Sequence, residues 1–175
     1  MGQYEFDGKK PKVHENAYIS PRSSLIGDVE IGEDSSIWES AVLRADMNYI
    51  RVGKGTSIQD NATVHTTFVN PTTIGDYVTA GHNCVIHACE IGDRTVVGMG
   101  SIVLDGAKVG KDCVIGAGSV VTNNTVIPDG SLVLGTPGKV VKEVPEGLRE
   151  SFMVGARLYV ELGKSHKTSE AGKNP

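Results

Sequence analysis

The sequence has few aromatic residues and few cysteines. Aromatic residues make up 5% of the 175 residues, and the three cysteines, Cys84, Cys89 and Cys113, contain no Cys-x-x-Cys pair. An odd number without that spacing argues against a disulfide framework and against a four-cysteine zinc site. Free thiols are therefore expected. Cys89, two residues after His87, is an alternative metal ligand, although it occupies a different point in the repeat described below.

An excess of positive charge and long apolar runs are also missing. The formal net charge is −4 and the calculated pI is near 5.7, whereas a nucleic-acid-binding domain usually presents a basic face. No segment approaches the ~18 consecutive apolar residues that a membrane-spanning helix needs, and the sequence does not open on a charged segment followed by an apolar one. We therefore expect a cytoplasmic protein with no nucleic-acid or membrane partner.

The dominant feature that is present is an apolar residue at about every sixth position. A period of six fits neither a 3.6-residue helix nor a two-residue strand alternation. It is typical of hexapeptide β-helix repeats, in which three short strands form one coil and stacked coils bury the apolar columns. An ordinary β-sandwich would have to reach the same spacing by accident. The repeated positions are Val13, Ile19, Leu25, Ile31, Ile37, Leu43, Val52, Ile58, Val64, Ile74, Ala80, Ile86, Ile91, Val97, Val103, Val109, Ile115, Val121, Ile127 and Val133.

The repeat sets the domain organisation. Residues 1–143 are expected to form an all-β, parallel β-helix domain of nearly seven coils, with residues 1–12 capping the first coil. Residues 144–163 are expected to form a helix packed on the same domain, because apolar residues recur there at helical spacing. These are Leu148, Phe152, Ala156, Tyr159 and Leu162. Residues 164–175 are polar and are expected to form a flexible tail.

The register of the repeat places individual side chains on the coil. We name the three faces B, C and A, so that Leu43 is on face A, Val52 on B, Ile58 on C and Val64 on A. Leu43 to Val52 contains an insertion of three residues, and Val64 to Ile74 an insertion of four. With these removed, three residues directly follow the face A position and form one column: Arg44, His65 and His87. Neighbouring rungs lie ~4.8 Å apart, so stacked imidazoles can share one metal ion.

A third histidine, His82, lies outside this column. It follows Ala80 on face C and lies one coil above Asp60, so the two occupy another edge of the coil. A threefold axis would bring the two edges together between subunits. Three imidazoles with one open position would form a catalytic type of zinc site. Each histidine taken alone could instead be a polar corner residue, and His14 and His166, near the chain ends, are expected to be solvated.

The motifs of this region resemble those of one enzyme family. "LRADMNYIRVGKGTSIQDNATVH", followed by "GHNCVIH" and "VGMGSIVLDGA", is similar to the γ-class carbonic anhydrases, and the resemblance extends over essentially the whole chain. The hexapeptide repeat alone is less specific, because acyltransferases share it. The resemblance implies a left-handed parallel β-helix, an exception to the usual right-handed crossover. It also implies a homotrimer with a metal ion at each subunit interface.

The resemblance also implies roles for individual residues. His65 and His87 match the metal ligands from one chain, and His82 matches the ligand from its neighbour. Arg44 and Asp60 match an ion pair between subunits. Asp46 and Gln59 match polar positions beside the metal, where Gln59 is suited to orient a water molecule.

The sequence departs from better-known members of the family around these residues. Met47 stands where those enzymes can carry a glutamate, and the loop after His65 has no acidic residue. Its Thr66, Thr67, Phe68 and Asn70 cannot relay a proton at neutral pH. Asn70 and Tyr159 are candidates for lining the site, although Tyr159 could instead be a helix-packing residue.

The predicted activity is the reversible hydration of carbon dioxide to bicarbonate. A dication on three neutral imidazoles lowers the pKa of bound water towards ~7, which yields a nucleophile for carbon dioxide. Zn²⁺ is the expected cofactor, with Fe²⁺ or Co²⁺ as alternatives. Turnover could be slow without the acidic relay. Two other hypotheses stay open: an acyltransferase using an acyl-CoA, suggested by the repeat and the turn "GTPGK", and a non-catalytic metal- or siderophore-binding protein.

Overall fold

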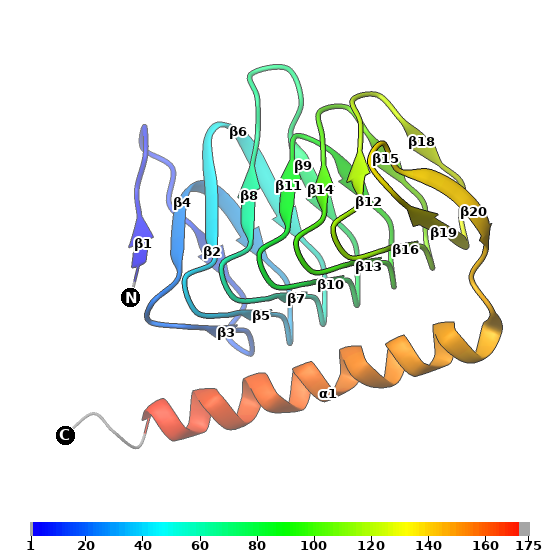
Figure 1. The fold of residues 1–175 in the computed structure, drawn as a ribbon. Helices are drawn as coiled ribbons and strands as arrows, with labels where there is room; N and C mark the ends of the chain where they lie inside the picture. Colours follow the sequence, from blue (N-terminus) through cyan, green and yellow to red (C-terminus); the bar gives the residue numbers. More distant parts are fainter. Residues whose placement is uncertain (1, 172–175) are drawn as a thin grey trace.

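The fold is a stack of short parallel strands with one helix beside it (Figure 1). The structure is a computed structural model, and it describes residues 2–171. The strands are β1 (Gly2–Tyr4), β2 (Lys12–Val13), β3 (Tyr18–Ile19), β4 (Ser24–Ile31), β5 (Ser36–Ile37), β6 (Val42–Val52), β7 (Ser57–Ile58), β8 (Thr63–His65), β9 (Thr72–Ile74), β10 (Thr79–Ala80), β11 (Val85–His87), β12 (Glu90–Ile91), β13 (Val96–Val97), β14 (Ile102–Val103), β15 (Lys108–Val109), β16 (Val114–Ile115), β17 (Val120–Val121), β18 (Val126–Ile127), β19 (Ser131–Leu134) and β20 (Lys139–Glu143).

These strands form the three faces that the repeat predicted. Strands β8, β11, β14 and β17 stack on face A, β9, β12, β15 and β18 on face B, and β5, β7, β10, β13 and β16 on face C. The longer strands β4 and β6 continue from face A into face B. Pairing is parallel throughout the stack, and the antiparallel pair β19–β20 ends it. The predicted left-handed parallel β-helix is therefore confirmed.

The register matches the one counted from the sequence. On face A, Leu43 pairs with Val64 and Val64 with Ile86, and all three side chains are fully buried. On face B, Val52 pairs with Ile74 across the second insertion. The first insertion lies within strand β6 and the second forms the loop after β8, so the apolar positions stay in the core.

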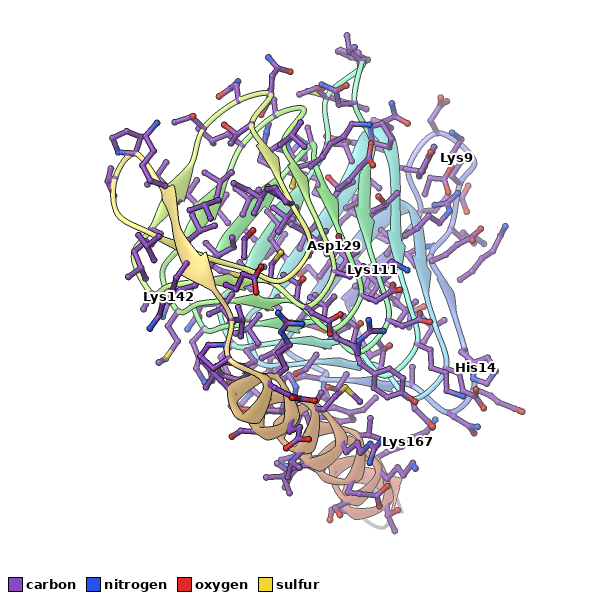
Figure 2. All side chains as sticks on the ribbon, turned by 90° about the vertical axis from the view of Figure 1, so that its right-hand side faces the viewer. Lys9, His14, Lys111, Asp129, Lys142 and Lys167 are labelled. Carbon is purple, nitrogen blue, oxygen red and sulfur yellow. The ribbon has the colours of Figure 1, made fainter. Side chains whose placement is uncertain are left out.

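Glycine is required where face B turns into face C. A Cβ atom added to Gly92 would lie 2.6 Å from the carbonyl carbon of Gly110 in the next coil. Aspartates then join neighbouring coils at this corner, since the Lys111 amide donates a hydrogen bond of 2.8 Å to Oδ1 of Asp129. Figure 2, viewed along the stack, labels these two residues at that corner. The coils can therefore stack closely only if the position of Gly92 carries no side chain.

The outward side chains differ between the three faces. Face B carries ion pairs between rungs, among them Lys12–Glu30 and Lys108–Glu90. Face C is covered by the helix. Face A carries the exposed Thr63 and four apolar outward residues that are only partly buried within the chain: Val42, Val85, Ile102 and Val120. Face A is thus the apolar face that this chain itself does not cover.

The helix, α1 (Glu146–Ala171), runs back along face C beside β3, β5 and β7 (Figure 1). It extends eight residues beyond the expected end at residue 163, so the predicted flexible tail was wrong for residues 164–171. This segment is polar, but it contains no proline or glycine before Gly172. Residues 172–175 of the predicted tail lie outside the described residues.

The contacts of the helix differ from those expected. Ala156 is 2% exposed and Val160 9%, whereas Leu148 is 37% and Leu162 39% exposed, so the buried stripe is shifted around the helix. Near its C-terminal end the helix docks through the ring of His166, which contacts Tyr18 and Trp38. Nζ of Lys167 also donates hydrogen bonds to the carbonyl oxygens of Glu15 and Ala17. His166 is exposed, as expected, and its ring also makes the two contacts just described. His14 is exposed, as expected.

The ends of the stack are covered by short elements. Strand β1 pairs with β4 and adds a rung to face A, which agrees with a cap formed by residues 1–12.

Among the described residues, no helix has the length and hydropathy required to cross a membrane.

The corner geometry predicts opposite effects for two glycine substitutions. Gly92→Ala should lower the free energy of unfolding by about 1–3 kcal/mol, because the new methyl group overlaps the next coil. Gly155→Ala should leave stability unchanged or raise it by up to about 1 kcal/mol, because its site on the helix is open and alanine favours helices. Urea unfolding of both variants measures the difference. Equal stabilities would contradict the close stacking of the coils.

Candidate metal centre

Two histidines meet at the end of face A. Strands β8 and β11 end in His65 and His87, which pair directly, and His65 also pairs with Arg44 of β6. The predicted column is therefore confirmed. Nδ1 of His65 lies 3.1 Å from Nε2 of His87, and the ring centroids are 5.1 Å apart.

A carboxylate binds the second ring nitrogen of each histidine. Nε2 of His65 lies 3.0 Å from Oδ1 of Asp46, and Nδ1 of His87 lies 2.5 Å from Oδ1 of Asp105. Arg44 in turn forms an ion pair with Asp46. Partial burial alone would raise the pKa of Asp46, but the hydrogen bonds from His65 and Arg44 outweigh it and lower that pKa. Asp46 is therefore a carboxylate at neutral pH.

These contacts suit the histidine pair for binding a cation. If each carboxylate accepts a hydrogen bond from its imidazole, the two facing nitrogens both present lone pairs. At 3.1 Å such lone pairs repel each other unless a proton or a metal ion lies between them. Two nitrogens bound to one tetrahedral zinc at ~2.0–2.1 Å are separated by about 3.3–3.4 Å, which is close to the observed spacing. The donor set thus fits one half of a zinc-type site.

Sequence reasoning did not identify Asp105. It follows β14 and lies 18 residues after His87, whereas the coil from β11 to β14 is 17 residues long. That spacing was available in the sequence. The relation was overlooked because the register places Asp105 level with Ala88, the residue after His87, and therefore one position outside the histidine column.

His82 lies at the opposite corner of face A. Its Nδ1 is 2.9 Å from Oδ2 of Asp60, which confirms that the two residues stack. Strand β11 separates His82 from His87, and three residues at ~3.3 Å each place roughly 10 Å between the corners. Within residues 2–171, no group of three or more His, Cys, Asp or Glu side chains could hold a metal ion. A single chain therefore presents two separate parts of the predicted ligand set.

The other predicted residues lie near these corners. Gln59 is 5% exposed, and in the described part of the chain its side-chain amide makes no hydrogen bond. Arg44 and Asp60 have partners within the chain, namely Asp46 and His82. Pairing of Arg44 with Asp60 between subunits stays a prediction.

The two insertions, one within β6 and one in the loop after β8, lie side by side next to His65. The Asn48 amide donates a 3.2 Å hydrogen bond to Oγ1 of Thr66, and the Asn70 amide donates one of 3.0 Å to Oγ1 of Thr67. Phe68 and Val69 at the loop tip are 79% and 84% exposed. Asn70 is thus in the loop that follows His65, and its contact with a substrate stays a prediction.

Tyr159 packs within the protein. Its ring meets Trp38 of face C edge-on at 5.8 Å between centroids. This contact supports the helix-packing alternative over a place in the site.

Comparison with known proteins gives a consistent result. Residues 10–45, 71–105 and 88–123 match the family described as bacterial transferase hexapeptide (six repeats). A carbonic anhydrase of Geobacillus kaustophilus is 41% identical over 165 residues, covering 94% of this chain and 90% of that protein. The mitochondrial gamma carbonic anhydrase 2 of Arabidopsis thaliana is 42% identical over 169 residues, covering 93% of this chain, which spans 61% of that protein's length.

A solved structure has the same fold. The crystal structure of a hexapeptide transferase family protein from Anaplasma phagocytophilum matches with a TM-score of 0.90 and 39% identity, covering 93% of this chain and 96% of that one. The fold and these matches define a hexapeptide-repeat protein. Within that class, the chain belongs to the γ-class carbonic anhydrase family.

The cysteines take no part in the histidine pair. Cys84, Cys89 and Cys113 are free thiols and all are buried, which confirms the expectation of free thiols. Burial raises the pKa of Cys84 to about 12 and also raises the pKa of Cys89. A thiolate at position 89 is therefore disfavoured, which argues against Cys89 as a ligand.

Burial of the thiols predicts their reactivity. At about pH 8 the folded protein should react with a chromogenic disulfide reagent at least about 100-fold more slowly than the unfolded protein, because the thiolates are disfavoured and shielded. The absorbance of the released thiol measures the rate. Reaction of all three thiols in denaturant is the control. Rapid reaction of one thiol in the folded protein would contradict its burial.

Proposed function

We propose that this protein hydrates carbon dioxide reversibly at a metal site shared between subunits. The observation that carries the proposal is the His65–His87 pair, in which both second ring nitrogens contact carboxylates. Such outer contacts orient imidazole ligands around a metal ion. The names of the relatives support carbonic anhydrase chemistry.

The assembly that we propose is a homotrimer. One corner of face A carries His65 and His87, and the other carries His82. A threefold axis that brings face A of each chain against its neighbour would join unlike corners at every interface. The apolar outward side chains of face A, which this chain leaves uncovered, support such a contact.

Each residue has a part in the proposed mechanism. His65 and His87 of one chain and His82 of the next would hold Zn²⁺, or alternatively Fe²⁺ or Co²⁺. The ion, when bound, would supply the Lewis acidity that lowers the pKa of a water molecule towards ~7. Gln59 is 5% exposed, and its side-chain amide has no hydrogen-bond partner among the described residues, so it is suited to orient that water or the substrate.

The remaining polar residues position the ligands and move the proton. Asp46 accepts a hydrogen bond from His65, and Arg44 neutralises its charge. The loops beside His65 contribute Met47, Phe68 and Val69, which cannot accept a proton. Proton release would therefore pass to buffer, and turnover could be slow. We also propose a cytoplasmic location, as expected from the sequence.

A second candidate is metal binding without catalysis. The two insertions beside His65 carry no acidic side chain other than Asp46, which already pairs with His65 and Arg44, and this favours it. The acyltransferase hypothesis is weaker, because acyl transfer requires one basic histidine and gives no reason for a facing imidazole pair.

The proposed function predicts metal content and activity in one sample. Protein purified without oxygen should contain about one divalent ion per chain and should accelerate carbon dioxide hydration. His87→Ala should lose most of the metal and the activity, because it removes a ligand from a pair without a substitute. Elemental analysis and a stopped-flow pH-indicator assay measure the two quantities.

The control for that experiment is His14→Ala, since His14 is exposed and remote from the histidine pair. Full metal content without hydration at any pH would favour the binding protein. Equal metal content in wild-type protein and His87→Ala would exclude the histidine site.

The shared site predicts complementation between two inactive variants. His65→Ala and His82→Ala should each bind little metal alone, but co-refolding equal amounts should restore about a quarter of the sites. Two kinds of chain can meet at an interface in four ordered pairs. Only one of these pairs joins the intact His65–His87 corner of the His82→Ala chain to the intact His82 of the His65→Ala chain. Metal per chain after co-refolding measures the recovery. No recovery in demonstrated mixed trimers would contradict a site built from two chains.

A further inference from the structure

Asp105 occupies a rigid place next to the histidine pair. It follows β14, one coil beyond β11, and its Oδ1 lies 2.5 Å from Nδ1 of His87. Backbone bonds fix it from both sides: the Asn124 amide donates to its carbonyl oxygen at 2.9 Å, and the adjoining Gly106 amide donates to the carbonyl oxygen of Ala88 at 2.8 Å. The carboxylate is thus placed by neighbouring coils.

We propose that Asp105 is a positioning residue that fixes the tautomer and ring orientation of His87. A carboxylate accepts hydrogen bonds and does not donate them, so this contact places a proton on Nδ1 of His87. Nε2 of His87 then presents a lone pair, and this is the atom that faces His65. The inference rests on the proposed metal site and adds one residue to it.

Asp105 also differs in charge from its counterpart Asp46. Asp46 pairs with both His65 and Arg44, whereas the ion-pair contact of Asp105 in the described residues is with His87. Arg44, Asp46 and Asp105 together carry one positive and two negative charges. The corner therefore has a net charge of −1 when both imidazoles are neutral. This negative charge favours the binding of a dication. Because Arg44 offsets the charge of Asp46, the negative charge comes from Asp105.

The test compares two aspartates whose substitution removes the same charge. Asp105→Asn and Asp105→Ala change the contact with His87. Asp112→Asn is the matched control, because Asp112 also pairs with a residue one coil earlier, Arg94, but at another corner. Thermal unfolding of the metal-free proteins establishes that each variant is folded.

Two measurements follow on the folded proteins. The first is Zn²⁺ affinity by competition with a chromophoric chelator, where both Asp105 variants should bind about 10–100-fold more weakly than wild type and Asp112→Asn should differ less than about twofold. The second is nitrogen NMR of metal-free, isotope-labelled protein. Wild-type His87 should show its proton on Nδ1, and Asp105→Ala should lose this preference.

The outcomes separate this inference from the proposed function. Equal zinc affinities for Asp105→Asn and Asp112→Asn, or a proton on Nε2 of His87 in wild type, would overturn the role of Asp105 while leaving the metal site intact. Zinc-loaded wild type that does not hydrate carbon dioxide would overturn the proposed function, and the affinity ratio would still decide the role of Asp105. A wild-type protein that binds no zinc would overturn both.

Discussion

Stacking of parallel coils at the spacing of a β-ladder is the constraint on which this structure depends. Rungs lie ~4.8 Å apart, so residues at the same point of consecutive coils must touch. Apolar residues at these points form a continuous core, as Leu43, Val64 and Ile86 do on face A. Glycines such as Gly92 permit the spacing at one corner. The same contact that builds the core brings His65 against His87.

The site uses this constraint to pre-form its ligands. Because the backbone of each coil is bonded to the next, the histidine rings and their carboxylate partners have little freedom to rearrange. Asp46 comes from the insertion before Val52, and Asp105 comes from the regular coil above His87. Pre-positioning of this kind reduces the entropy lost when an ion binds. It would also allow the proposed metal site to be divided between rigid subunits.

Departures from the six-residue period gather beside the histidine pair. The strand β6 and the loop after β8 both contain extra residues, and they contact each other through Asn48 and Thr66. Loops can vary without disturbing the stack, because the coils above and below pair without them. The scaffold can therefore stay constant while the surroundings of the histidines change. In this chain the loop after β8 has no acidic residue and exposes Phe68 and Val69.

The sequence by itself determined the coil, the insertions and the column of Arg44, His65 and His87. This was possible because a repeated backbone converts residue spacing directly into position. It also indicated that His82 belongs to another edge with Asp60. The end of the helix and its buried stripe depended on the tertiary structure, since docking of His166 and Lys167 onto the first coils stabilises a polar segment with no apolar pattern. The contact of Asp105 with His87 also depended on the tertiary structure. It runs diagonally between rungs, where side-chain direction matters as well as spacing.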